Sequence, residues 1–367
     1  MSTSFWDSLP RPIIALAPMA DVTDVAFRRV IAKYGKPDVM WTEFVSVEGL
    51  THPMGREKLL LDLAYDEIER PIVAQVFGAD PEKFYEVARL CVELGFDGID
   101  INMGCPVDSI NRQRAGTDLI KNPSLAQEIV RATKQGVVDA VFNCHPGHDP
   151  GSRSVPIPVS VKTRAGYSQP SIETWIPQLL ETEPAALILH ARTKKEMSKV
   201  PAPWERIKQA REIRDAMGST TLLIGNGDVE NVGQAFARVE ETGADGAMIG
   251  RGFFGNPWLC ADLRAEREAW LTAKKAPGTF LNPKNVPGSL EDPREKLPWA
   301  ERLRVLIEHA QLFEELIMPQ KPFAVMRKHF GSYVSGFDGA KELRIQLMVA
   351  ESASELEKIL RDAGYPA

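Results

Sequence analysis

Residues 71–106 read PIVAQVFGADPEKFYEVARLCVELGFDGIDINMGCP, and this stretch decides the fold. Its two ends, 71–77 and 98–103, are short and mostly apolar, as strands buried on both faces are. Between them, residues 81–95 carry apolar side chains at helical spacing: Phe84, Val87, Ala88, Cys91 and Leu94. A strand, a helix and a second strand in this order predict two parallel strands joined by a crossover helix.

The same alternation continues in both directions along the chain. Six more short apolar runs, each bounded by Gly, Pro or charge, are predicted as strands: 13–18, 40–44, 158–163, 187–191, 221–225 and 246–250. Eight alternations of strand and helix favour a closed parallel barrel over an open sheet. We therefore predict an α/β fold, a (β/α)8 TIM barrel, over residues 1–263.

The remainder of the chain has a different pattern. Residues 264–297 are predicted as a linker, because the part from 273 onward is rich in Pro, Gly and charged residues. Residues 298–367 carry helical patterning alone, as in WAERLRVLIEHAQLFEELI at 299–317. This pattern predicts a small all-helical C-terminal domain.

Composition narrows the class of protein. The chain has 367 residues, of which 44% are hydrophobic and 26% charged, as in ordinary globular proteins. It contains no apolar run long enough to span a membrane, and its first residues lack the pattern of a signal peptide, so we expect a cytoplasmic protein. The net charge of −6 argues against a general polyanion binder, although a local basic face remains compatible with it.

The cysteines are scattered, and one of them occupies a special position. None of the four belongs to a C-x-x-C pair, so they are predicted to be reduced thiols. In a barrel of this kind the reactive groups lie at the C-terminal ends of the strands. Cys105 follows such a strand end after Gly104, whereas Cys91 lies on the helical stripe. We therefore predict that Cys105 is catalytic.

Polar residues at other strand ends are predicted to face the barrel axis. The fifth strand ends in Lys162-Thr163-Arg164, and alternation places the two cations on one side. The sixth ends in His190-Ala191-Arg192, which repeats this arrangement. Buried cations are costly without an anionic or electron-rich partner, and Gln75 on the third strand also needs partners for its amide. The sequence thus predicts a polar ligand at the barrel mouth.

Three further turns are predicted to complete this mouth. Asn226-Gly227-Asp228 and Gly250-Arg251-Gly252 follow the seventh and eighth strands, where this architecture binds phosphate groups. Pro18-Met19-Ala20 forms a tight turn after the first strand. In contrast, Cys144, His145, His148 and Asp149 lie in an irregular loop at the opposite face, and we predict a surface insertion there and no metal site.

Several segments, taken together, resemble the tRNA-dihydrouridine synthase family. They occur in the order of that family: APMADVTDVAFR, PIVAQVFGADPEKF, DGIDINMGCPVDSINRQRAG, VSVKTRAGY, LILHART, IGNGDVEN and GADGAMIGRGFFGNPWL. The C-terminal KPFAVMRKHFGSYVSGFDGAKELR is similar to the helical domain of the bacterial B-type members. The chain departs from the family at Ala191, where glycine is usual, and at Asp118, where a small residue is usual.

The resemblance implies an FMN enzyme that reduces the C5–C6 bond of uridine in tRNA with NADPH as electron source. It implies that Cys105 gives a proton to C5 and that Asn102 and Arg164 hold the uracil ring, flipped out of the RNA. The residues implied to contact FMN are Pro18, Met19, Ala20, Gln75, Lys162, His190, Asn226, Gly227, Asp228, Gly250 and Arg251. The B-type similarity points to a uridine of the D-loop, and we expect a monomer.

The expected tRNA contact requires cations near the mouth. Arg112 and Arg114 follow Cys105, and the segment 319–345 adds five basic side chains: Lys321, Arg327, Lys328, Lys341 and Arg344. We expect a basic stripe that joins the helical domain to the mouth, with Arg327 and Lys328 contacting tRNA.

Three other functions remain open from the sequence. A flavin barrel that reduces a free pyrimidine or small enone accounts for the mouth and leaves the helical domain unused. A lyase or aldolase would use Lys162 as a Schiff base. An RNA-binding protein without catalysis would not require Cys105, Lys162 and His190 together.

Overall fold

The computed structural model of the chain describes residues 4–142, 155–274, 294 and 297–365. Eight strands occupy its centre: β1 Ile13–Leu16, β2 Met40–Ser46, β3 Ile72–Phe77, β4 Gly98–Met103, β5 Val159–Arg164, β6 Ala186–His190, β7 Leu222–Asn226 and β8 Gly246–Ile249. All neighbouring pairs are parallel, in the order β1-β8-β7-β6-β5-β4-β3-β2. A parallel bridge between Ala15 and Val39, next to β2, brings the two ends of the sheet together. The predicted (β/α)8 barrel is confirmed.

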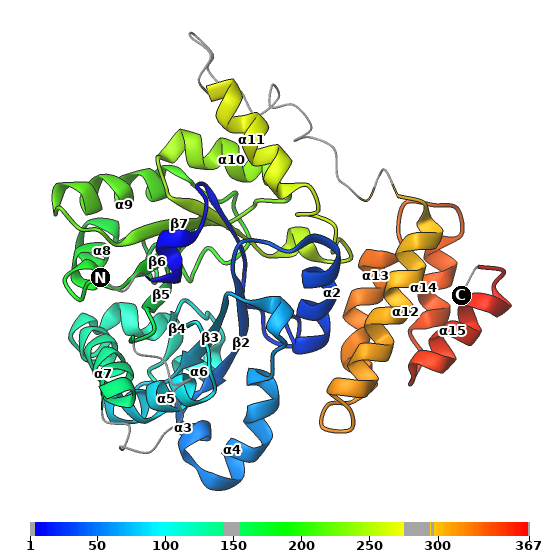
Figure 1. The fold of residues 1–367 in the computed structure, drawn as a ribbon, viewed down its shortest axis with the longest axis horizontal. Coiled ribbons are helices and arrows are strands. Elements are labelled where there is room, and N and C mark those ends of the chain that lie inside the picture. The colour runs from blue at the N-terminus through cyan, green and yellow to red at the C-terminus, as the bar shows by residue number, and fades with distance from the viewer. Residues whose placement is uncertain (1–3, 143–154, 275–293, 295–296, 366–367) are drawn as a thin grey trace.

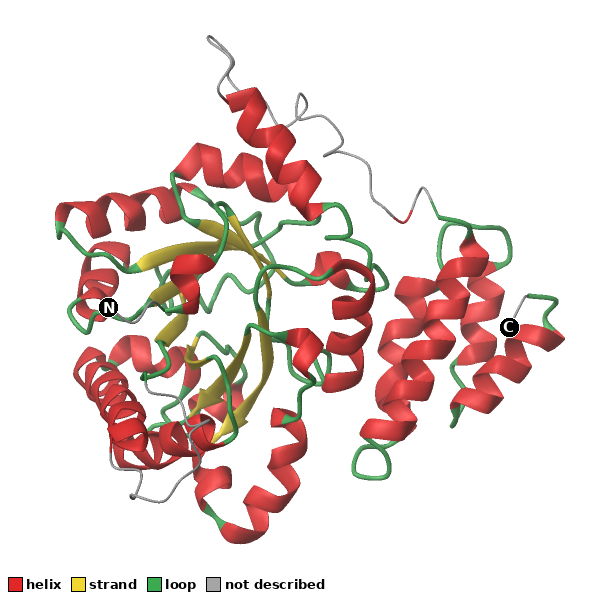
Figure 2. Cartoon of the chain, viewed as in Figure 1, coloured by secondary structure: helices red, strands yellow, loops and turns green. Residues whose placement is uncertain are grey.

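Helices surround the strands, as Figure 2 shows in red around yellow. The longer ones are α2 Val25–Gly35, α5 Pro81–Glu93, α7 Pro123–Phe142, α8 Ile172–Leu180, α9 Glu205–Ala216, α10 Val232–Thr242 and α11 Leu263–Lys274. Shorter ones lie in the loops after strands: α3 Val47–Thr51, α4 Pro53–Leu59 and α6 Asp108–Asn111. None of the described helices is long and apolar enough to cross a lipid bilayer.

Helix α5 shows how the sequence forms these elements. The Asp80 side chain accepts the N–H of Glu82 at 3.0 Å and caps the helix start, where Pro81 takes the first position. Gly95, with a φ of +80°, follows the helix end. The predicted apolar stripe is buried from Phe84 to Cys91, which packs the helix onto the barrel.

Two layers of apolar side chains hold the barrel together. An inner cluster includes Ile13, Val73, Ile188 and Met248, and an outer layer fills the space between strands and helices. The short helix α1, Phe5–Ser8, adds Trp6 to the inner cluster, where its ring centroid lies 6.0 Å from that of Trp41. The inner layer is packed, so ligands must bind at the mouth.

The predicted linker is wrong in its first part. Residues 263–274 form helix α11, in which the Trp270 ring lies 5.5 Å from Phe236 on α10. The Arg267 guanidinium pairs with buried Asp38 at 2.5 Å. The helix was missed because most of its residues are polar and a few long side chains anchor it. Residues 275–293 lie outside the described residues.

A helical region follows the barrel: α12 Trp299–Leu316, α13 Arg327–Tyr333, α14 Ala340–Leu347 and α15 Ala353–Asp362. Figure 1 shows these helices, in orange and red, beside α2 of the barrel. Val25, Ala26 and Val30 of α2 share an apolar core with them. At the edge of this contact, Glu308 accepts from Lys33 and from the Tyr34 hydroxyl, both at 2.6 Å. The predicted all-helical C-terminal region is confirmed.

Candidate functional site

A series of hydrogen bonds runs from the barrel interior to Cys105. Alternation along β4 turns Asp100 and Asn102 inward, and the β3–β4 register places Gln75 opposite Asp100. Gln75 Nε2 donates to the Asp100 carboxylate at 2.6 Å, and Gln75 Oε1 accepts from Asn102 Nδ2 at 2.9 Å. Asn102 Oδ1 in turn accepts the backbone N–H of Cys105 at 2.9 Å. The buried carboxylate thereby orients both amides and fixes the Cys105 backbone.

The Cys105 thiol is nearly buried, with 7% of the residue exposed. Burial raises the pKa of this thiol above its usual value, against the opposing effects of the Val107 backbone N–H, Arg164 and Lys162. A thiol with a raised pKa keeps its proton at neutral pH. Cys105 is therefore suited to give a proton and unsuited to act as a thiolate nucleophile.

The loop after Cys105 is folded around its carbonyl group. That oxygen accepts from the Thr117 backbone N–H at 3.1 Å and from Asn111 Nδ2 at 3.2 Å. Gly116 has a φ of +63°, and a Cβ there would lie 2.7 Å from the same oxygen. Only glycine fits this approach. The loop holds the position of Cys105 from the outside, as Asn102 does from the inside.

An apolar wall adjoins the thiol. Phe44 in β2 and Phe77 at the end of β3 pack on the small cluster that Cys105 forms with Ile110 and Ala115. The two rings meet edge to face, with centroids 5.6 Å apart. Neither ring was predicted from the sequence, although both are half-buried aromatic side chains and Phe77 lies at a strand end. Such a wall excludes water from one side of the mouth.

Lys162 lies at the mouth, and the positive charge of its ammonium group is only partly balanced. Its Nζ donates to Asn226 Oδ1 at 3.3 Å, while Asn226 Nδ2 donates to the Met248 carbonyl at 2.8 Å. Burial, together with repulsion from Arg164, lowers the pKa of Lys162 to about 8. An amide oxygen carries a partial charge, so the ammonium favours a further anionic or electron-rich partner.

Arg164 and His190 lie side by side on neighbouring strands, as their register requires. Arg164 Nε donates to the Gly104 carbonyl at 2.8 Å, and its Nη1 is 3.5 Å from His190 Nδ1. Burial and the nearby cations lower the pKa of His190 well below its usual value, so the ring is neutral. Its Nδ1 accepts the N–H of Arg192 at 3.2 Å, which assigns the proton to Nε2. His190 is thus a hydrogen-bond donor on its Nε2 side.

Asp228 organises two arginines after β7. It forms ion pairs with the buried Arg192 and with Arg251, the latter at 2.9 Å. Burial alone raises the pKa of Asp228, but hydrogen bonds from Arg192 and the Ala202 N–H hold it below the usual value. Asp228 is therefore a carboxylate that positions Arg251, whose side chain is 71% exposed. A carboxylate itself repels a phosphate group. The contact of Asp228 with the cofactor stays a prediction.

The turns after β1, β7 and β8 surround the same space. A Cβ on Gly250 would lie 3.4 Å from the Met19 sulfur, so the β1 and β8 turns adjoin. A Cβ on Gly227 would lie 3.7 Å from His190 Nε2, which places the β7 turn beside the histidine. Pro18 and Met19 are half-buried and Ala20 is exposed. The structure thus brings these predicted residues together.

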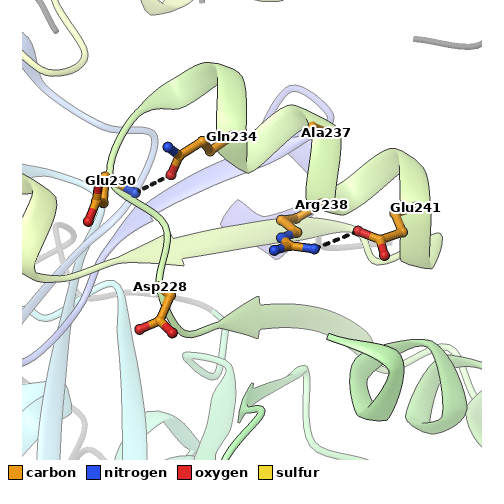
Figure 3. Close-up of a pocket in the computed structure, with 6 residues that line it drawn as sticks. All are labelled: Asp228, Glu230, Gln234, Ala237, Arg238 and Glu241. Atoms are coloured by element: carbon orange, nitrogen blue, oxygen red, sulfur yellow. Dashed lines mark hydrogen bonds and ion pairs between the residues drawn. The ribbon is translucent and has the colours of Figure 1, made fainter. Parts of the chain in front are cut away.

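A separate cavity of about 440 Å³ opens beside α10. Figure 3 shows Asp228 below the helix, with Glu230 near Gln234 and Arg238 paired with Glu241. The three carboxylates outnumber the one guanidinium in its lining, which disfavours a phosphate. Gly227, Gly250 and Arg251 stay the predicted contacts of a phosphate group.

The predicted basic residues are only partly brought to the mouth. Arg112 and Arg114 are exposed after Cys105. Arg327 Nη2 donates to the Ala350 carbonyl at 3.2 Å within the helical region, and Lys328 Nζ donates to the Asp21 carbonyl at the β1 turn. The expected stripe of free cations is therefore interrupted by contacts within the chain.

Lys321 is the clearest case of such a contact. Its Nζ pairs with Asp62 at 2.7 Å and with Glu43 at 3.2 Å, both on the barrel. The prediction of a basic stripe had placed Lys321 among the surface cations. The sequence offers no sign of this contact, because the partners are more than 250 residues away.

Among the described residues, no group of three or more His, Cys, Asp or Glu side chains has a metal-binding arrangement. Cys144, His145, His148 and Asp149 lie outside the described residues, so the predicted surface insertion stays a prediction.

Comparison with known proteins covers nearly the whole chain. A family model described as "Dihydrouridine synthase (Dus)" matches residues 15–364. The chain is 37% identical over 362 residues to the "Probable tRNA-dihydrouridine synthase" of Staphylococcus aureus (strain COL), which covers 98% of this chain and 95% of that protein. It is 36% identical over 364 residues to the "Probable tRNA-dihydrouridine synthase 2" of Bacillus subtilis (strain 168), covering 99% and 97%. The similarity includes both the barrel and the helical region.

Proposed function

This chain belongs to the dihydrouridine synthase family, and we propose that it reduces the C5–C6 bond of uridines in tRNA, with bound FMN and with NADPH as electron donor. The observation that carries the proposal is Cys105, a protonated thiol fixed by Asn102 beside two half-buried cations, Lys162 and Arg164. The names of the two relatives support tRNA as the substrate.

The charges of the mouth fit a flavin. Lys162 and Arg164 are half-buried, His190 is neutral, and the Asp100 carboxylate balances only part of the positive charge. An isoalloxazine ring offers carbonyl oxygens and ring nitrogens along one edge, and this edge becomes more electron-rich on reduction. This edge would therefore give Lys162 the electron-rich partner that its surroundings favour. Gln75 keeps a second N–H on Nε2 after its bond to Asp100, which suits the same edge.

The remaining predicted residues fit the other parts of FMN. The Gly227 and Gly250 turns leave space that a side chain would fill, and Arg251 offers a charge-assisted donor for the phosphate. Asn226 is held by Lys162 and Met248 at the same rim. Pro18, Met19 and Ala20 provide the wall after β1, and His190 donates from Nε2.

Bound FMN would supply a hydride to C6 of the uracil ring. The Cys105 thiol gives its proton to C5, so that one hydride and one proton together saturate the C5–C6 bond. Negative charge that develops on the uracil carbonyl during this step is stabilised by the Arg164 guanidinium. Asn102 has one N–H left after its bond to Gln75, and this N–H binds a uracil carbonyl.

The position of the thiol requires a base that leaves the RNA stack. Cys105 is 7% exposed and lies within the mouth, where a base still stacked within tRNA does not reach it. The target uridine therefore enters as a flipped nucleotide, with Phe44 and Phe77 near its pocket. The D-loop and a monomeric enzyme remain the expected substrate region and state.

The test is nucleoside mass spectrometry of tRNA that lacks dihydrouridine, after incubation with the protein, FMN and NADPH. We expect uridine to gain the mass of two hydrogen atoms in tRNA, with no reaction on free UMP. Reduction of UMP without reaction on tRNA would instead identify a free-pyrimidine reductase. A protein that binds no FMN and is trapped by borohydride at Lys162 would identify a lyase or aldolase.

A further inference from the structure

A second cavity lies on the rim of the mouth beside Cys105. Its closeness to the thiol suggests what it binds. This rim groove has a volume of about 460 Å³, and its lining includes Val107, Asp108, Tyr167, Lys194, Lys195 and Met197. These residues come from the loops after β4, β5 and β6. We propose that the rim groove binds the nucleotide next to the target uridine in the same RNA strand. This inference rests on the proposed function.

The groove is within reach of a neighbouring nucleotide. Val107 is two residues from Cys105, so their Cα atoms are at most about 7 Å apart. Tyr167 is three residues from Arg164, whose guanidinium is proposed to bind the uracil carbonyl. Both loops therefore continue outward from groups that hold the flipped base, and the next nucleotide of the strand lies over them.

Exposed apolar side chains provide a surface for a base. Val107 is 50% exposed and Met197 is 42% exposed, and they lie on different loops of the groove. Met197 also has a φ of +51°, a backbone conformation that a long side chain rarely adopts. Proteins that bind single-stranded RNA place apolar and aromatic groups against successive bases beside cations for the backbone. Val107, Met197 and the half-buried Tyr167 provide such groups here.

The charges of the groove complement a phosphodiester. Lys194 Nζ bonds Asp108 Oδ1 at 3.0 Å and lies 5.0 Å from the centre of the Tyr167 ring. The Asp108 side chain is 76% exposed, so its pair with Lys194 is weak and a phosphate can replace it. Lys195 is exposed and adds a second cation. Two lysines against one aspartate favour an anionic ligand, and a nucleotide combines that anion with a flat apolar base.

The experiment changes the groove and the RNA separately. The groove variant combines Lys195→Ala with Met197→Asn, because asparagine tolerates a positive φ better than most side chains. Lys208→Ala, on the outer helix α9, is the matched control. The substrates are a tRNA that lacks dihydrouridine and the same tRNA with an abasic site on either side of the target uridine.

We expect the groove variant to raise the KM for tRNA about tenfold, with kcat, FMN binding and NADPH oxidation close to wild type. In the wild type, an abasic site on one side of the target should raise KM to a similar extent. In the groove variant, that abasic site should not raise the KM further, because both changes remove the same contact between the groove and the neighbouring base.

The outcomes separate this inference from the proposed function. A wild type that forms dihydrouridine, with a groove variant whose KM is unchanged, overturns the inference alone. Additive effects of the variant and of the abasic site also overturn it. A wild type that forms no dihydrouridine in any tRNA removes the proposed function, and the inference with it.

Discussion

At the scale of single residues, surroundings decide which proton each group holds. Cys105 and Lys162 both lie at the mouth, and burial shifts their pKa values in opposite directions. The neutral form is favoured in each case, because burial penalises charge. The Cys105 thiol therefore keeps its proton, whereas the Lys162 ammonium releases a proton at a lower pH than usual. An electron-rich ligand edge restores the charged form of Lys162.

The pH dependence of FMN binding tests this view of Lys162. The pKa of about 8 means that the ammonium loses its proton as the pH rises through that value. We expect the affinity for FMN to fall above about pH 8, and Lys162→Met to bind about tenfold more weakly at pH 7 with a flatter pH profile. Flavin fluorescence titration measures both. A variant whose affinity follows the same pH profile as the wild type would show that another group titrates.

The candidate residues at strand ends were predicted from the sequence, and the groups that orient them were not. Cys105, Lys162 and Arg164 were predicted because the barrel architecture assigns reactive positions to strand ends. Asp100 was missed, although alternation puts it on the same face as Asn102. Its importance depends on Gln75, which lies on another strand, and a single strand pattern does not show that bond.

At the scale of elements, helix α2 begins with an unusual cap. The Asp24 side chain accepts the Phe27 N–H at 2.9 Å, while its Oδ2 has no hydrogen-bond partner among the described residues. Burial raises the pKa of this carboxyl to about 7. The folded protein therefore binds a proton at Asp24 more tightly than the unfolded chain does. Its free energy of unfolding falls as the pH rises from about 4 to about 7.

Asp24→Asn tests this cap. The amide oxygen keeps the bond to Phe27 and removes the buried charge. We expect the gain in free energy of unfolding to be larger at pH 8 than at pH 5, by about 2 kcal/mol. Urea denaturation at the two pH values measures the difference. A gain that is equal at both pH values, or a loss at pH 8, would show that Asp24 carries no destabilising charge in the folded protein.

Elements whose residues are uniformly apolar and buried were predicted well. Elements that bury only a few side chains were predicted poorly. Every strand was found, because each is apolar and lies between two layers of side chains. Helix α11 was assigned to a linker, because its buried residues include Arg267, whose partner Asp38 lies far away in the sequence. In a sequence, a buried arginine cannot be distinguished from a surface arginine unless its acidic partner is known.

At the scale of the whole molecule, Lys321 joins the helical region to the barrel. It pairs with Asp62 and with Glu43, which is 4% exposed. These contacts replace a role that the sequence had suggested for Lys321, namely part of a basic face for RNA. Sequence analysis predicted the two regions and did not predict this junction, since nothing local marks a contact between distant segments.

Replacing Lys321 tests the junction. Lys321→Met leaves Glu43 buried without its cation, and we expect a loss of about 2 kcal/mol in free energy of unfolding. Adding Glu43→Gln should recover part of this loss, because the unpaired charge is removed. Lys341→Met, at an exposed position on α14, is the control. Equal stability of the Lys321 and Lys341 variants in urea denaturation would show that the junction contributes little.

The most direct test of the account separates the two half-reactions at Cys105. In single-turnover experiments with Cys105→Ala, NADPH should reduce the bound flavin as fast as in the wild type. The reoxidation of that flavin by tRNA lacking dihydrouridine should slow by a factor of about 100 or more, because the proton for C5 is missing. Reoxidation by tRNA at the wild-type rate would contradict the role of Cys105 as proton donor.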